Sequence, residues 1–211
     1  ARLSSPTSVC IRIARAIRGA SEAVLPYVTE ADGRIARVLL LGPPGCGKTT
    51  VLRDAAERLA ERGFRAAVCD EREELFPEDA AQAGIDVMRG ADKATAIQML
   101  LRAMAPQVIL CDEIGDMRDV RALKDAARCG VGLMASAHAG TFDDVRRRPV
   151  LRALYEAAAF DRYLLLGRHG KLEAAYDAVG GLLAGGGNAH DGCGDDGDAY
   201  AERRRFCGGG R

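Results

Sequence analysis

The chain has 211 residues, which is enough for one full α/β domain and too few for two large ones. Its 30 basic and 30 acidic residues cancel, so no overall field favours nucleic acid or an anionic membrane. No apolar run reaches the roughly 18 residues of a spanning helix, so we expect a protein that is not itself transmembrane.

The pattern along the chain divides it into three parts. Because the chain begins with Ala1 rather than Met, residues 1–36 are interpreted as the lead-in from a truncated upstream region. Residues 37–179 alternate apolar runs with amphipathic helical patterns, which predicts an α/β domain with a mostly parallel sheet flanked by helices. Residues 180–211 are rich in glycine and poor in large apolar side chains, so we expect a disordered tail.

The elements of the central part follow in chain order. Residues 38–41 predict a strand, and the helix after it is expected to end at Gly63, a residue type suited to a helix C-terminus. Thr141 and Asp144 resemble a capping box that opens a short helix. The other predicted elements are a strand at 64–69, a helix at 92–104, a strand at 108–111, a helix at 119–128, a strand at 131–137, a helix at 150–158, and a hairpin of 162–166 with 172–176.

Residues 42–50 read GPPGCGKTT, and this stretch fits the phosphate-loop pattern with a strand before it and a helix after it. The glycines let backbone N–H groups turn toward a phosphate, and the helix that begins near Lys48 adds its positive dipole end. Lys48 should reach the phosphates of a nucleotide, and the Thr49 hydroxyl should bind Mg²⁺. The predicted nucleotide-binding residues are Gly42, Pro43, Pro44, Gly45, Cys46, Gly47, Lys48, Thr49 and Thr50. The alternative is a glycine-rich loop without a ligand.

Polar side chains follow three of the predicted strands, as Asp70-Glu71, Asp112-Glu113 and His138. The carboxyl ends of parallel strands meet at one edge of a sheet, so we expect these groups to gather near the phosphate loop. Asp112 would hold Mg²⁺, and Glu113 would orient and deprotonate the attacking water, as in a Walker B element. An acidic turn after a buried strand is the alternative for this pair.

Glu71 and His138 each allow two interpretations. Glu71 is a second candidate for polarising the water, and the alternative is a surface acid. His138 ends a long apolar strand and could contact the γ-phosphate, although a histidine satisfied by backbone groups fits the same position. Arginines are candidates for charge stabilisation in phosphoryl transfer. They are Arg72, Arg89, Arg102, Arg146, Arg147 and Arg148.

Two further features restrict the ligand and the compartment. Asn188 is the only asparagine of the chain, so the Asn-Lys-x-Asp element that reads guanine in GTPases is absent, which favours ATP. Seven cysteines occur without a Cys-x-x-Cys pair, which argues for reduced thiols and a cytoplasmic protein.

Several short stretches occur together in a characteristic order. They are 11–15, 25–27, 42–50, 52–54, 70–72, 101–106, 112–115, 136–139 and 148–151, which cover the chain from near its start to the last predicted helix. With this set, the sequence resembles the stage III sporulation protein AA family, ATPases of the AAA type related to type II and type IV secretion motors.

The resemblance implies a P-loop NTPase with a RecA-like core and Mg²⁺-dependent ATP hydrolysis. It also implies a homo-oligomeric ring, with a hexamer as one candidate, that works with membrane-associated proteins of a secretion-type sporulation channel. Glu71 would correspond to the acidic box of secretion motors and His138 to their histidine box.

Two other functions remain as alternatives. A nucleic-acid-associated ATPase is one, although neutral net charge and few aromatic residues give no strong nucleic-acid signal. A small-molecule kinase is the other, but the adjacent carboxylates of Asp112 and Glu113 suit an activated water better than an acceptor hydroxyl.

Overall fold

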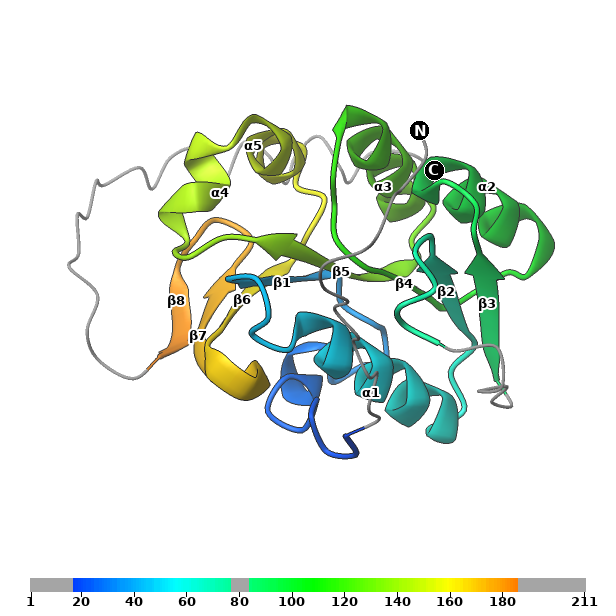
Figure 1. The fold of residues 1–211 in the computed structure, drawn as a ribbon, viewed down its shortest axis with the longest axis horizontal. Helices are drawn as coiled ribbons and strands as arrows, with labels where there is room; N and C mark the ends of the chain where they lie inside the picture. The colour runs from blue at the N-terminus through cyan, green and yellow to red at the C-terminus, as the bar shows by residue number, and fades with distance from the viewer. Residues whose placement is uncertain (1–16, 77–83, 186–211) are drawn as a thin grey trace, which may run out of the picture.

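The computed structural model describes residues 17–76 and 84–185 (Figure 1). Eight strands form one sheet in the order β3-β2-β4-β5-β1-β6-β7-β8. The first six strands of this order, from β3 to β6, run parallel to one another, whereas β7 is antiparallel to both β6 and β8. The strands are β1 (Val38–Gly42), β2 (Ala66–Asp70), β3 (Ile85–Arg89), β4 (Val108–Cys111), β5 (Gly132–His138), β6 (Arg162–Leu166), β7 (Leu172–Asp177) and β8 (Leu182–Gly185). The predicted α/β fold with a mostly parallel sheet is therefore confirmed.

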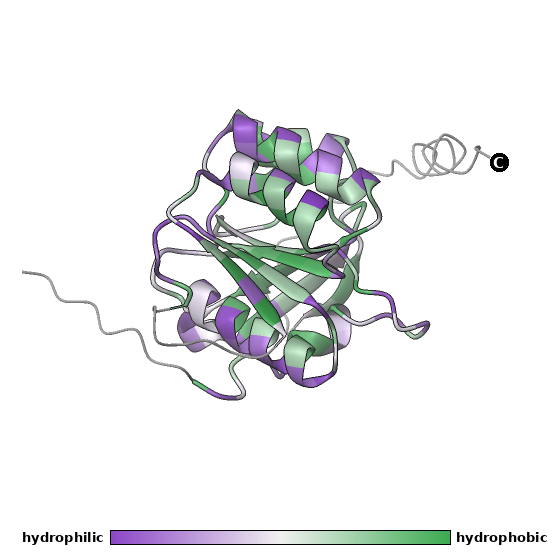
Figure 2. Cartoon of the chain, turned by 90° about the vertical axis from the view of Figure 1, so that its right-hand side faces the viewer, coloured by the Kyte–Doolittle hydropathy of each residue, from purple (hydrophilic) through white to green (hydrophobic). Residues whose placement is uncertain are grey.

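Helices cover both faces of this sheet. The 3-10 helix η1 (Leu25–Tyr27) and α1 (Lys48–Glu61) lie on one face, below the sheet in Figure 1. The other face carries α2 (Lys93–Ala103), α3 (Met117–Arg128), α4 (Asp143–Arg147) and α5 (Pro149–Glu156). Figure 2 shows the hydrophobic strands enclosed between these two layers, whose outer surfaces are hydrophilic.

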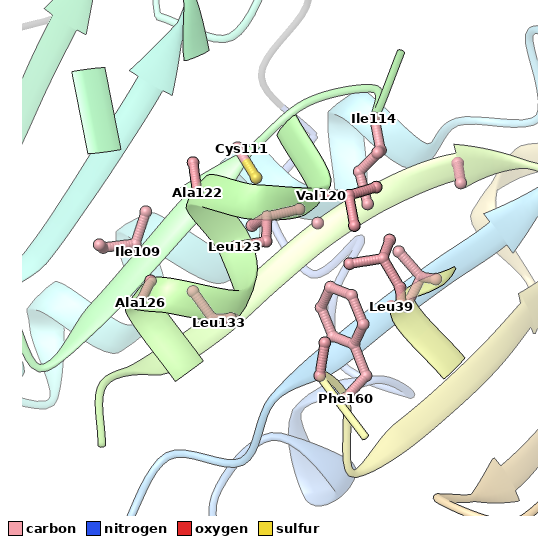
Figure 3. Packing of buried hydrophobic residues seen from close by; sticks show 14 of the residues in the cluster. Leu39, Ile109, Cys111, Ile114, Val120, Ala122, Leu123, Ala126, Leu133 and Phe160 are labelled. Carbon is pink, nitrogen blue, oxygen red and sulfur yellow. The ribbon is translucent and has the colours of Figure 1, made fainter. Parts of the chain in front are cut away.

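The two layers create two hydrophobic cores, because side chains of a strand alternate between its faces. Along β1, Leu39 and Leu41 pack toward α3, whereas Val38 and Leu40 pack toward α1. Figure 3 shows the first core, where Val120, Leu123 and Ala126 of α3 lie over Leu39 of β1 and Leu133 of β5. Continuous apolar runs are expected for parallel strands that are buried on both faces.

Local signals in the sequence set the helix ends. Gly63 adopts φ +86° just after α1, which confirms it as the stop of that helix. At α2, the Asp92 side chain accepts a hydrogen bond from the Thr95 N–H group. Asp116 and Asp119 form a capping box at the start of α3. That helix therefore begins at Met117, two residues before the predicted start.

Three details differ from the sequence predictions. Strand β3 was not predicted, because its short, half-exposed sequence at the edge of the sheet has little apolar pattern. Strand β8 lies within residues 180–211, so the assignment of all these residues to a disordered tail was wrong for Leu182–Gly185. Only one of the two bonds of the predicted capping box is present: the Asp144 carboxylate accepts the N–H groups of Thr141 and Gly140, whereas α4 begins after Phe142 without a side-chain cap.

Some predictions concern residues outside the described ranges. Residues 1–16 of the lead-in and residues 186–211 of the tail lie outside the described residues, as do residues 77–83.

The hairpin predicted at the end of the domain is confirmed as β6 and β7, joined through the 3-10 turn η2 (Arg168–Gly170).

Candidate active site

The phosphate loop connects β1 to α1 and is fixed from two sides. At Gly42, an added Cβ would lie 2.6 Å from Cys46 Sγ and 2.7 Å from the Leu166 carbonyl oxygen, so only glycine allows this close approach. The Gly170 N–H group donates to the Cys46 carbonyl at 2.6 Å, which docks η2 on the loop. Gly47 has φ +105° and precedes the first turn of α1, whose leading N–H groups have no carbonyl within the helix.

Lys48 is buried beside this loop. Its ammonium group donates to the carbonyl oxygens of Gly42 and Pro43, both at 2.9 Å, and lies 3.1 Å from Nδ1 of His138. A lysine has three N–H donors, and these three acceptors match them. The charge is therefore held at the mouth of the loop, between the ends of β1 and β5.

His138 connects Lys48 to Glu113. Because the Lys48 ammonium group can only donate, Nδ1 of His138 accepts its hydrogen bond. The proton of a neutral imidazole then lies on Nε2, which is 3.2 Å from Oε1 of Glu113. The two neighbours select this tautomer, and the three side chains form one polar chain across the ends of β1, β5 and β4.

Asp112 lies in a second set of polar contacts. Its Oδ1 atom accepts hydrogen bonds from the Ser136 hydroxyl at 2.9 Å and from the Glu113 N–H group at 2.8 Å. Its Oδ2 atom accepts from the Thr49 hydroxyl at 3.2 Å. Thr49 and Asp112, predicted to hold one metal ion, are thus adjacent.

The two acids at the end of β2 have different environments. Asp70 is buried and accepts the N–H groups of Glu74, Leu75 and Phe76, so it shapes the chain after β2. Glu71 turns toward Lys93, whose ammonium group lies 3.5 Å from its Oε2 atom. Of this predicted pair, only Glu71 lies at the site as a side chain with an accessible carboxylate.

A pocket of about 150 Å³ lies between the ends of β2 and β4. Acidic and basic groups line it together: Cys69, Asp70, Glu71, Arg72, Lys93, Asp112, Glu113 and Gly115. Arg72 lies 3.4 Å from Oε2 of Glu113, so both carboxylate oxygens of Glu113 have a nitrogen neighbour. The pocket continues the site from Asp112 and Glu113 toward β2.

The predicted arginines separate into different roles. Arg72 contacts Glu113, and Arg148 donates to the carbonyl oxygen of His138 at 2.6 Å, which supports the end of β5. Arg146 instead lies over the rings of Phe142 and Tyr155, on the face of the sheet that carries α4 and α5.

Three polar residues of the site were not found from sequence: Ser136, Lys93 and Asp119. Ser136 carried a signal, since it is the only polar residue among buried neighbours within β5 and lies on the same face as His138. Lys93 also carried one, because a lysine at the first position of a helix faces the positive end of its dipole. Asp119 could be interpreted only as a helix-starting acid.

The residues present fit a phosphate and a hard divalent cation. The loop supplies backbone donors and Lys48 supplies a charge, which suits a phosphate group. In the described ranges, no three His, Cys, Asp or Glu residues cluster as metal ligands. Mg²⁺ at phosphate sites retains several waters and needs only one or two protein oxygens, so Thr49 and Asp112 are sufficient.

Comparison with solved structures identifies the fold. The chain resembles the Legionella pneumophila ATPase DotB, with a TM-score of 0.54 and 15% identity over 68% of this chain and 43% of that one. The pilus retraction motor PilT gives a TM-score of 0.50 and 19% identity over 72% of this chain and 48% of that one. At these identities the likeness shows the fold alone, which is that of a P-loop NTPase with a RecA-like core.

Sequence comparison defines the family. The profile described as "Sporulation stage III, protein AA" matches residues 3–183, and the chain belongs to this family. Stage III sporulation protein AA of Bacillus subtilis is 39% identical over 189 residues, which are 82% of this chain and 61% of that protein. The chain thus spans less than two thirds of the length of this relative. No helix within the described segments has the length and apolar character needed to cross a membrane.

Proposed function

We propose that this chain hydrolyses ATP in a Mg²⁺-dependent reaction. The observation that carries the proposal is that two sets of polar side chains meet at the site. Lys48, His138 and Glu113 form one chain, while Thr49, Asp112 and Ser136 form another, and Asp112 and Glu113 join them at the end of β4. These contacts support a proposal in which phosphate binding, metal binding and a base for water lie together at one edge of the sheet.

Each residue has a role in this proposal. Lys48 would bind the phosphates, exchanging one of its present acceptors for a phosphate oxygen. Thr49 and Asp112 would hold Mg²⁺, which when bound neutralises charge on the phosphate oxygens. Glu113 would accept the proton of the attacking water, a contribution of about 10²–10⁴ in rate for general base catalysis. His138 would orient the Glu113 carboxylate and link it to Lys48.

ATP is preferred over GTP as the substrate. The only asparagine of the chain, Asn188, lies outside the described residues, and the Asn-Lys-x-Asp element that reads guanine is absent from the sequence. The names of the structural neighbours, an ATPase and a pilus motor, also support an ATP-driven reaction.

Turnover of the purified protein tests the proposal. Mg²⁺ and ATP should release phosphate, and removal of Mg²⁺ should abolish the release. Glu113→Gln should retain ATP affinity but reduce turnover by at least about tenfold. Glu156→Gln is the matched control, because this exposed acid at the end of α5 pairs with Arg152 of the same helix, and it should remain within about twofold of the wild type. Equal turnover in the Glu113 variant would remove the base from the proposal.

The second part of the proposal concerns the assembly and the location of the protein. We infer a homo-oligomer, with a ring as the expected form, that works in the cytoplasm at a membrane complex of secretion type during sporulation. Membership of the sporulation family and the fold shared with DotB and PilT support this inference. Light scattering with and without ATP tests it, since a motor should assemble when it binds nucleotide. An active protein that stays monomeric under all conditions would contradict it.

A further inference from the structure

We propose that Lys93 is a positioning residue for Glu113, and that Glu71 acts through Lys93 rather than on the attacking water. This inference rests on the proposed ATPase function and deepens it. It assigns a role to a buried charge that no motif predicts, and it separates the two acids that the sequence left as alternatives for polarising the water.

The placement of Lys93 is unfavourable by itself. Lys93 is the first residue of α2, where the helix dipole disfavours a positive charge, and its side chain is only 7% exposed. A buried ammonium group requires partners that replace its hydration. Its contacts therefore indicate what the charge does in the fold.

Lys93 reaches across to the ends of two strands. Its Nζ atom donates to the carbonyl oxygen of Glu113 at 2.6 Å and lies 3.5 Å from carboxylate oxygens of both Glu71 and Asp119. The charge of Lys93 is thus shared between the residue after β2 and the first turn of α3. Its shortest contact is with the backbone of the proposed catalytic base.

The backbone from Glu113 to Gly115 is held from three directions. Lys93 donates to the Glu113 carbonyl oxygen, the Ser136 carbonyl oxygen accepts the Ile114 N–H group at 2.9 Å, and the Asp119 carboxylate accepts the Gly115 N–H group at 2.8 Å. Lys93 also pairs with Asp119, so two of these three supports depend on it. Loss of the ammonium group should loosen the segment that aims the Glu113 side chain.

The charge of Lys93 is stable in this environment. Burial alone would lower the pKa of Lys93, but the surrounding acidic groups, Asp119 and Glu71 among them, outweigh it and raise that pKa above its usual value. The ammonium group therefore stays available to Glu71 and to the Glu113 carbonyl.

The partners of the two acids differ accordingly. Glu71 has its carboxylate beside Lys93, whereas the Glu113 carboxylate lies beside His138, which contacts Lys48 of the phosphate loop. The side chains of His138 and Lys48 therefore link Glu113 to the phosphate loop. Glu71 is linked to Glu113 through Lys93. This difference makes Glu113 the base and Glu71 the partner of the positioning residue.

Kinetics of Lys93 variants give the first test. Lys93→Met should reduce kcat by about 10- to 100-fold, because a base displaced by about 1 Å loses that much, while the Kd for ATP changes by less than about threefold. Lys93→Arg, which keeps the charge, should recover part of the loss. Lys124→Met on α3 is the control, since this lysine lies away from the site, and it should remain within about twofold of the wild type. An unchanged kcat in folded Lys93→Met would overturn the proposal.

A double-mutant cycle separates the roles of Glu71. Glu71→Gln should reduce kcat less than Lys93→Met and should cause almost no further loss in the Lys93→Met background, because coupled residues are not additive. A direct catalytic role of Glu71 would instead reduce kcat by the same factor in both backgrounds. That result would overturn the assignment of Glu71.

Hydrogen exchange tests the positioning without depending on turnover. In Lys93→Met, the amides of Ile114 and Gly115 should exchange about tenfold faster or more than in the wild type, while the amides of β5 remain protected. Exchange equal to the wild type would overturn the positioning role. If the wild type shows no ATP turnover, the proposed function fails, and the exchange rates still decide whether Lys93 fixes this segment.

Discussion

The Nε2 atom of His138 lies 3.2 Å from Oε1 of Glu113, so the residue that ends β5 orients the acid that follows β4. The other ring nitrogen lies 3.1 Å from Lys48 Nζ. The His138 imidazole thereby connects Lys48 of the phosphate loop to Glu113, the proposed base. A phosphate that draws Lys48 away from His138 would free Nδ1 while Nε2 keeps its partner.

Replacement of His138 tests this link. His138→Ala should reduce kcat by about 10- to 100-fold, because Glu113 loses its orienting donor, and should change the Kd for ATP by less than about threefold. Phosphate release and fluorescence titration with a labelled nucleotide measure the two quantities. A loss of affinity that equals the loss of turnover would instead make His138 a binding residue.

Ser136 supports the proposed metal site, because it donates to the Asp112 oxygen that faces away from Thr49. Removal of a group that orients a metal ligand typically weakens metal binding by about 10- to 100-fold. We therefore expect Ser136→Ala to raise the Mg²⁺ concentration for half-maximal turnover by about tenfold.

Ser21→Ala is the matched control for this measurement. Ser21 is an equally buried serine whose hydroxyl donates to Asp54 at 2.5 Å, away from the phosphate loop. Its loss should reduce stability and leave the Mg²⁺ dependence unchanged. A similar shift in both variants would show that the effect of Ser136→Ala is a general loss of stability.

The glycines of the phosphate loop should differ in their tolerance of alanine. Gly45 and Gly47 both have positive φ angles, of +72° and +105°, so alanine strains the backbone at either position. Only at Gly47 would the new Cβ lie 3.1 Å from a backbone atom, the nitrogen of Gly170, whereas nothing lies within 4 Å at Gly45. Gly47→Ala should therefore lower the free energy of unfolding by about 1 kcal/mol or more beyond Gly45→Ala. Equal losses in urea unfolding would contradict the close packing of η2 on the loop.

Local patterns account for much of what could be predicted from sequence. The phosphate loop, the two acids after β4 and the histidine after β5 each follow a buried strand, and their convergence comes from the parallel sheet. Glu113, Lys48 and His138 could therefore be identified together before their contacts were known. Their contacts add the tautomer of His138 and the direction of each hydrogen bond.

The features that sequence did not predict depend on contacts between distant elements. Lys93 belongs to α2, yet its partners follow β2 and β4 and lie in α3. No periodicity within one element encodes such a contact. Strands β3 and β8 were missed for a related reason, because an exposed strand at or near a sheet edge needs less apolar sequence than a central one.

Asp54 should make stability depend on pH. Burial alone would raise the pKa of its carboxyl group, but hydrogen bonds from Ser21 and Gly19 and the nearby charge of Arg58 outweigh it and lower that pKa. A lowered pKa in the folded state gives stability that is full above the unfolded value of about 3.9 and is lost as pH falls through the folded value. The stability advantage of the wild type over Asp54→Asn should therefore be largest near neutral pH and shrink below about pH 4.

Urea unfolding of both proteins between about pH 3 and pH 7 measures this difference. At neutral pH, Asp54→Asn should lose about 1–3 kcal/mol, because the amide group replaces a charged acceptor and turns one of its two oxygens into a donor. Since these bonds tie residues 19–21 to α1, the same variant should increase amide exchange in that segment first. A difference in unfolding free energy that stays constant across the pH range would mean that the carboxyl group has the same pKa in the folded and unfolded chain.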